Sequence, residues 1–321
     1  MHCVNYIWKT RKMIKDLALE QVVGHHHALG TSITLQIFGT QKRDLLQKSF
    51  ELIDHYEDLL TVNRDESEVM DINHAAGDHP VQVSSPVYGL VKLAVEKSRE
   101  NFGFNALIGP VVKLWHIGFK GAHVPKDSEI KERMLLTDPF KVVLNDQDQT
   151  VFLKMKGMEL DLGGIAKGWI ADRIRDLWLA YGVEAGIINL GGNILLVGDS
   201  PKRANGQWVI GIQDPKEPRG DNITSVMVSQ CSAVTSGTYE RYLVVDGHKY
   251  HHLIDPRTGY PVETDLAGVT TFTKTSVEAE IECKRLFFAS HPMKNWHDDS
   301  DRIGAIFVYN DEHVEYDNFN K

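Results

Sequence analysis

The sequence predicts an α+β fold with mixed or antiparallel sheets and packed helices, because its strands come in runs and its helices stand between the groups. Apolar residues recur every three or four positions in four stretches, which is typical of amphipathic helices: residues 42–60, 85–102, 166–181 and 275–289. Short alternating or apolar stretches indicate strands: residues 32–38, 142–144, 151–153, 185–190, 208–212, 225–228, 233–234, 242–245 and 303–309. A doubly wound parallel sheet would need stricter alternation of the two kinds.

The first half of the chain begins with an alternating strand. Residues 32–38 place Ile33, Leu35 and Ile37 on one face. Residues 42–60 follow with apolar side chains at helical spacing, namely Leu46, Phe50, Ile53, Tyr56 and Leu60. We expect residues 63–73 to form a loop that enters a short helix, and residues 85–102 to form a second helix before the break at Gly109-Pro110.

The second half begins with a predicted hairpin around the polar residues 145–150. The turn at Gly163-Gly164 then opens the helix over residues 166–181. The helix over residues 275–289 has one apolar side and precedes the closing strand over residues 303–309.

Composition places the chain among ordinary globular proteins. It has 321 residues, 42% of them hydrophobic and 25% charged, which is enough for one large core or two lobes. The net charge of −9 argues against a nucleic-acid-binding protein, which normally has a basic surface. We expect a peripheral segment over residues 1–23, the main domain over residues 24–310 and a C-terminal tail over residues 311–321.

Several classes of site and location are disfavoured. The three cysteines, Cys3, Cys231 and Cys283, are too few and too widely spaced for a disulfide framework or a Cys-rich zinc site. No apolar stretch approaches the ~20 residues that cross a bilayer. The N-terminal residues lack a secretory apolar segment, and none precedes Cys3 as a lipid anchor would require. The expected location is therefore the cytoplasm. The run His25-His-His27 is not expected to bind a metal, because consecutive side chains point in different directions.

Four glycine-rich segments carry the functional signal. They are Asp161-Leu-Gly-Gly-Ile-Ala-Lys-Gly168, Asn189-Leu-Gly-Gly-Asn193, Thr235-Ser-Gly-Thr-Tyr-Glu-Arg241 and His252-Leu-Ile-Asp-Pro-Arg-Thr-Gly259. Glycine lacks a Cβ, so ligand oxygens can approach backbone N–H donors closely. The first segment opens a helix, whose N-terminus favours anions, and Lys167 adds a full positive charge. Each segment alone is also compatible with an ordinary turn; together they predict a site for a phosphate-bearing ligand.

Three further residues add candidate chemistry. His252 can carry a proton near neutral pH, and Asp255 can bind a cation or orient a donor. A buried core histidine is the alternative. Trp115 is either a core residue or a cover for a flat heterocycle.

Taken together, these motifs resemble the ApbE family, the FAD:protein FMN transferases, over residues 24–310. The remaining elements of the resemblance occur in the family's order: Leu29-Gly-Thr31, Ser67-Glu-Val69 with Ile72-Asn73, Gly109-Pro-Val111 with Trp115, and Trp208 with Gly211. The resemblance implies an ApbE-like fold and protein flavinylation, in which the FAD pyrophosphate is cleaved, FMN is attached to a Thr or Ser of an acceptor protein, and AMP leaves. It also implies a divalent cation, Mg²⁺, at the pyrophosphate.

The resemblance assigns site residues by motif. The catalytic candidates are His252, Asp255 and Lys167. The FAD-binding candidates are Leu29, Asn63, Ala106, Leu107, Ile108, Asp161, Lys167, Thr235, Ser236, Gly237, His252 and Ile254. The metal-site positions are Gly164, Glu280 and Lys284. No Ser/Thr-Gly-Ala-Thr acceptor segment occurs in the chain, so self-modification is not expected.

The sequence departs from the family pattern at four positions. Leu29 replaces the usual Met, and Asn63 stands where many relatives have an aromatic ring. Loss of that ring would admit water and favour hydrolysis of FAD to FMN and AMP. In Ala279-Glu-Ile-Glu-Cys-Lys284, the family's metal-ligating Asp and Thr are replaced by Glu280 and Lys284.

An ammonium has no lone pair for a metal. Mg²⁺ is then bound by the Gly164 carbonyl, Glu280 and phosphates, or the Lys284 ammonium supplies part of its charge. The competing functions are an FAD pyrophosphatase and a non-catalytic FAD-binding protein.

Overall fold

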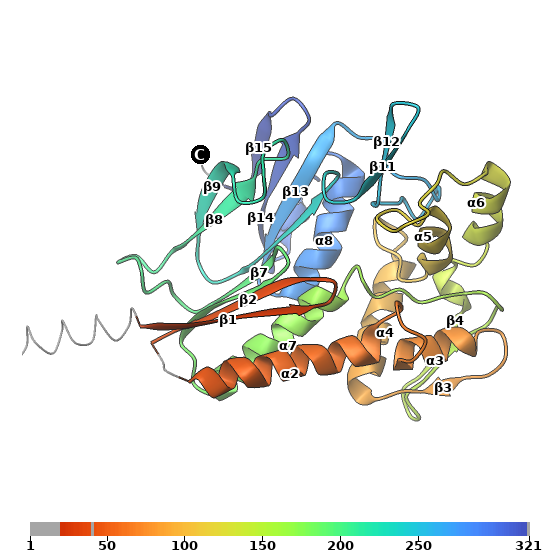
Figure 1. Ribbon diagram of the computed structural model, residues 1–321, viewed down its shortest axis with the longest axis horizontal. Coiled ribbons are helices and arrows are strands. Elements are labelled where there is room, and N and C mark those ends of the chain that lie inside the picture. Colours follow the sequence, from red (N-terminus) through yellow and green to blue (C-terminus); the bar gives the residue numbers. More distant parts are fainter. Residues whose placement is uncertain (1–19, 40–41, 320–321) are drawn as a thin grey trace, which may run out of the picture. The chain divides into compact units, whose positions relative to one another are not determined.

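The computed structural model describes residues 20–39 and 42–319 (Figure 1). These residues divide into two compact units. The first unit contains the described residues up to His55 together with Lys167–Val234 and Phe272–Ala279. The second contains Tyr56–Ala166, Thr235–Thr271 and the described residues from Glu280 onward. Most of the predicted peripheral segment therefore lies outside the described residues.

The first unit is built on antiparallel strands. Five strands are neighbours in the order β1-β2-β6-β7-β10, with bounds β1 Gln21–Ala28, β2 Thr31–Phe38, β6 Ala185–Leu190, β7 Asn193–Val197 and β10 Ser232–Gly237, the last of which ends in the second unit. Strands β8 (Trp208–Gln213) and β9 (Asn222–Val228) form a separate antiparallel pair. Two helices begin or continue here, α2 (Arg43–Leu60) and α7 (Ala166–Ala180).

The helices α2 and α7 pack on each other and on the sheet. The indole N–H of Trp178 in α7 donates to the Ser49 hydroxyl of α2 at 2.9 Å. A Cβ on Gly186 of β6 would lie 2.5 Å from the Trp178 ring, so only glycine allows this close approach. The helices predicted over residues 42–60 and 166–181 are thus confirmed, and both contribute buried side chains to this part of the core.

The second unit holds most of the short elements. Its helices are α3 Glu68–His74, α4 Ser85–Arg99, α5 Gly109–Trp115, α6 Asp127–Met134 and the greater part of α8 Ser276–Ala289, with 3-10 turns η1 Pro139–Lys141 and η2 Trp296–Asp298. Strands β3 (Val81–Gln82), β5 (Thr150–Leu153) and β4 (Val142–Asn145) form one sheet in that order. β11 (Tyr242–Val245) and β12 (His248–His251) form a hairpin. β13 (Leu266–Thr273), β14 (Arg302–Tyr309) and β15 (Val314–Asp317) are successive neighbours.

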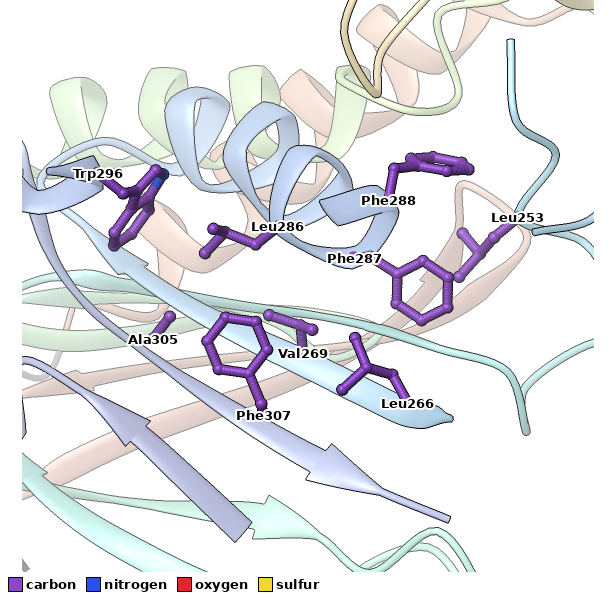
Figure 2. Close-up of a cluster of buried hydrophobic side chains, with 9 residues drawn as sticks. All are labelled: Leu253, Leu266, Val269, Leu286, Phe287, Phe288, Trp296, Ala305 and Phe307. Atoms are coloured by element: carbon purple, nitrogen blue, oxygen red, sulfur yellow. The ribbon is translucent and has the colours of Figure 1, made fainter. Parts of the chain in front are cut away.

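One apolar cluster joins α8 to the strands of the second unit (Figure 2). Leu286 and Phe287 of α8 pack with Val269 of β13 and Phe307 of β14, and all four side chains are fully buried. Burial of each such side chain contributes about 1.5–3 kcal/mol. This cluster therefore fixes α8 against β13 and β14.

The α+β prediction is confirmed, and the predicted helices and strands fall within a few residues of the observed ones. The sequence missed β1, β3, α5, α6, β7, β12, β13 and β15. Ordered strands extend past both predicted limits of the main domain, since β1 begins at Gln21 and β15 reaches Asp317. None of the described helices combines the length and apolar character that a membrane crossing requires.

The three consecutive histidines lie on β1. The ring of His26 forms a hydrogen bond of 2.7 Å with the Asp54 carboxylate and packs on Phe50. The ring of His25 forms one of 3.1 Å with the Thr34 hydroxyl. Among residues 20–39 and 42–319, no group of three or more His, Cys, Asp or Glu side chains is arranged to hold a metal ion.

Removal of the buried Leu286 side chain should weaken the second unit. We expect Leu286→Ala to lower the free energy of unfolding by about 2–5 kcal/mol, because a cavity replaces packed atoms. The matched control is Leu135→Ala, since Leu135 is 70% exposed, and it should change stability by less than about 0.5 kcal/mol. Urea denaturation measures both. Equal effects of the two substitutions would contradict the packing described for α8.

Candidate functional site

Two segments far apart in the sequence lie side by side in the second unit. The backbone N–H of Asp161 donates to the Ala106 carbonyl at 2.8 Å. A Cβ on Gly109 would lie 3.1 Å from the Glu159 carbonyl oxygen, so the two segments are also close at these neighbouring residues. Asn105 fixes its own segment, because its side chain accepts from the Leu107 N–H and donates to the Thr137 carbonyl. The predicted FAD-binding segment Ala106 to Ile108 is thereby held beside Asp161.

Asp161 shapes the glycine turn before α7. Its carboxylate accepts from the Gly163 N–H at 2.8 Å, which is the local bond of an Asx turn. Burial raises the pKa of Asp161, while the Gly163 bond and the positive charge of Lys113 oppose that rise. The backbone N–H groups of Ile165 and Ala166 both bond to the Leu162 carbonyl, which starts the helix. Asp161 thus positions the Gly163-Gly164 backbone.

Lys284 reaches the same turn from α8. Its ammonium donates to the Glu280 carboxylate and to the Glu280 carbonyl, each at 3.0 Å. A Cβ on Gly164 would lie 3.0 Å from Lys284 Cε and 3.7 Å from Nζ. The Phe104 ring lies 3.5 Å from the same point. The three positions that the resemblance assigns to a metal, Gly164, Glu280 and Lys284, are therefore brought together, with an amine between them.

His252 follows β12 directly. Its Nδ1 lies 3.2 Å from the Arg241 carbonyl. A carbonyl only accepts, so Nδ1 carries the proton and Nε2 keeps its lone pair. Burial lowers the pKa of His252 to about 4, with smaller contributions in the same direction from the positive charges of Arg241 and Lys284. His252 is therefore a neutral base at pH 7.

Asp255 forms a tight turn instead of contacting His252. Its carboxylate accepts the backbone N–H of Arg257 at 2.8 Å and pairs with the Arg257 guanidinium at 2.7 Å. Its carbonyl accepts from Gly259 at 2.8 Å. Trp115 anchors the turn through a bond of 2.8 Å from its indole N–H to the Gly259 carbonyl. Trp115 is itself fully buried and packs with Ile254, so it is a core residue.

The end of β10 supplies hydroxyl groups to the same unit. Thr235 is exposed, and its hydroxyl lies 2.8 Å from that of Thr270 on β13. Ser236 is buried, and its hydrogen bonds lower the pKa of Cys283 against the larger opposing effect of burial. Ser236 thus lies beside Cys283, the residue that precedes Lys284.

The remaining predicted FAD-binding residues belong to other elements of the chain. Asn63 is exposed in the loop after α2, where its N–H donates to the Thr61 hydroxyl at 3.2 Å. Leu29 and Lys167 belong to the first unit. Leu29 has a φ of 54° in the turn between β1 and β2, and Lys167 is the second residue of α7.

Sequence reasoning missed three residues that the second unit places at the site. The Phe104 ring packs beside Gly164. The carbonyl of Arg241 accepts a hydrogen bond from the His252 ring. The guanidinium of Arg257 pairs with the Asp255 carboxylate. Phe104 and Arg241 lie within or next to quoted motifs, but no spacing rule selects them. Arg257 lies two residues after Asp255, a separation at which side-chain pairing depends on turn geometry.

The depressed pKa of His252 has a measurable consequence. We expect the His252 ring to titrate near pH 4, because burial disfavours its charged form. The folded state then binds the proton less readily than the unfolded chain does. The contribution of His252 therefore destabilises the fold as pH falls from about 6.5 to about 4. NMR titration, with the signal assigned by its loss in His252→Gln, measures the midpoint. A midpoint at or above 6.5 would exclude a ring whose pKa is lowered by desolvation.

Comparison with known proteins agrees with this architecture. A family model described as "ApbE family" matches residues 29–307. A relative from Klebsiella pneumoniae, named FAD:protein FMN transferase, is 46% identical over 260 residues, or 81% of this chain and 79% of its own. One of the same name from Treponema pallidum is 38% identical over 73% of this chain and 68% of its own.

Solved structures agree as well. The ApbE protein from Thermotoga maritima has a TM-score of 0.82 at 28% identity, over 93% of this chain and 97% of its own. The fold of the flavinyl transferase ApbE from Pseudomonas stutzeri is also similar, with a TM-score of 0.78 at 23% identity over 93% and 95% of the two chains. Since the family model spans most of the chain and two relatives exceed 30% identity, this protein is a member of the ApbE family.

Proposed function

We propose that this chain is an FAD:protein FMN transferase. The observation that carries the proposal is the 46% identity, over 81% of the chain, with a relative of that name. The second unit supports it with a neutral histidine, a glycine turn at a helix start and a lysine ammonium in one region. Phosphoryl transfer needs these three kinds of group for proton removal, phosphate positioning and charge neutralisation.

The proposed reaction balances as follows. The hydroxyl oxygen of an acceptor Thr or Ser forms a bond to the phosphorus of the FMN half of FAD. The bond from that phosphorus to the bridging oxygen breaks, and AMP leaves with the bridging oxygen and its electron pair. The hydroxyl proton passes to Nε2 of His252, which is the nitrogen that the Arg241 carbonyl leaves unprotonated.

Other residues of the chain act by positioning. We assign the segment Ala106 to Ile108 and Ile254 to FAD contact, and Thr235, Ser236 and Gly237 to donation toward phosphate or acceptor. Leu29, Asn63 and Lys167 stay predicted FAD-binding residues, and the catalytic role of Lys167 also stays a prediction. Asp255 stays a predicted catalytic residue, and its pairing with Arg257 supports a role in holding the turn that follows His252.

The residues at the family's cation position do not fit a Mg²⁺ ion bound by all three. Mg²⁺ takes oxygen ligands. Position 284 presents an ammonium that already pairs with the Glu280 carboxylate. We therefore derive no step through Mg²⁺. The acceptor protein's identity is not encoded in this chain, and the cytoplasmic location stays a prediction.

The direct test is covalent transfer. Purified protein, FAD and Mg²⁺ are incubated with an acceptor protein that carries a Ser-Gly-Ala-Thr segment. We expect the acceptor mass to rise by that of FMN less water, with one AMP released per FMN attached. An unchanged acceptor mass, with FAD shown to be bound, would contradict the proposal. Free FMN and AMP without acceptor would instead identify the hydrolase that Asn63 motivates, and FAD left intact would identify a binding protein.

A substitution of His252 tests its role within that assay. We expect His252→Ala to reduce the transfer rate by about 10²–10⁴-fold, the usual contribution of a general base. A parallel FAD titration separates loss of the base from loss of the predicted contact between His252 and FAD. The matched control is His79→Ala, because His79 is exposed in the loop after α3, and it should leave the rate unchanged. Unaltered transfer by His252→Ala would remove this residue from the mechanism.

A further inference from the structure

An ion pair stands against the glycine turn where a dinucleotide phosphate is proposed to bind. Glu280 is 4% exposed, so its carboxylate depends on partners in the protein for stabilisation. The Lys284 ammonium is one such partner, at 3.0 Å, from the next turn of the same helix. The contact with Gly164 places this ammonium beside the turn backbone.

The donors of this ammonium are only partly used. An ammonium has three N–H groups and no acceptor. Among residues 20–39 and 42–319, two of the three are used, both by Glu280. The side chain of Lys284 remains 17% exposed. One donor is therefore available for an oxygen that the described protein groups do not supply.

We infer that the Lys284 ammonium, held by Glu280, is a built-in cation that replaces a bound divalent ion at the Gly163-Gly164 turn and donates to a phosphate oxygen of FAD. This inference rests on the proposed function for the identity of the ligand. A charge-assisted hydrogen bond between an ammonium and a phosphate is about twice as strong as a neutral one. The chain thus supplies covalently a positive charge that an ion would otherwise bring.

The test compares FAD binding with and without divalent cations. FAD fluorescence is titrated with the full chain in EDTA and again in excess Mg²⁺. Wild-type affinity should be the same within about twofold in the two conditions. In Lys284→Thr, affinity in EDTA should fall about tenfold or more, because a hydrogen bond to a charged group is lost. Mg²⁺ should restore it, since Thr and Glu280 both offer oxygen ligands.

A second variant and a direct ion measurement separate charge from packing. Lys284→Met keeps a long unbranched side chain but removes the charge and offers no oxygen ligand to Mg²⁺. Its weakened FAD binding should therefore not respond to Mg²⁺. The electron paramagnetic resonance signal of free Mn²⁺ should persist with wild-type protein and FAD, and should fall with Lys284→Thr. Thermal melting reports whether each variant folds. The matched control is Lys92→Thr, which removes the half-exposed partner of Asp146 and should leave FAD binding unchanged.

The outcomes distinguish this inference from the proposed function. A wild-type protein that binds one Mn²⁺ and loses FAD affinity tenfold in EDTA would overturn the inference, while transfer could still be observed. FAD binding that is independent of Mg²⁺ but not followed by transfer would support the inference and contradict the proposed function.

Discussion

The packing of α8 against β13 and β14 is the constraint on which the candidate site of the second unit depends. Leu286 and Phe287 are fully buried against these strands (Figure 2). One turn earlier in α8, Glu282 is buried and accepts hydrogen bonds from the Arg285 guanidinium at 2.8 Å and from the Trp296 indole at 2.7 Å. Because the core holds α8 in place, the backbone of Lys284 has a fixed position, and the position of its ammonium follows from core packing.

The positive charge of Lys284 affects both the proposed base and the proposed phosphate site. The positive charges of Arg241 and Lys284 add to burial in lowering the pKa of His252, so the ring stays a neutral base. The ammonium also faces the turn that Asp161 shapes through Gly163. In a region of reduced solvent exposure, electrostatic interactions act more strongly than in water. The base and the phosphate donor are therefore coupled through one lysine.

Periodicity predicted the long elements well, and the reasons for the failures are physical. The helix α2 buries one side, so its apolar residues recur at helical spacing. β13 is buried at all eight positions and so lacks the alternation of a half-exposed strand. The helices α5 and α6 have only seven and eight residues, too few for a clear period.

The sequence predicted the residues of the site only where they belong to a recognisable motif. Gly164, Glu280 and Lys284 came from the ordered resemblance, and the structure brings them together. The spacing of His252 and Asp255 did not reveal that Asp255 bonds within its own turn and to Arg257. Such pairings depend on backbone dihedral angles after the strand ends, which residue types alone do not specify.

The most direct test of the central claim is a crystal structure of the protein with FAD grown in Mn²⁺, analysed by anomalous scattering. The account predicts Lys284 Nζ at about 2.7–2.9 Å from a phosphate oxygen, with no anomalous peak at Glu280. A Mn²⁺ peak bound by Glu280 and the Gly164 carbonyl, with the lysine turned away, would contradict it.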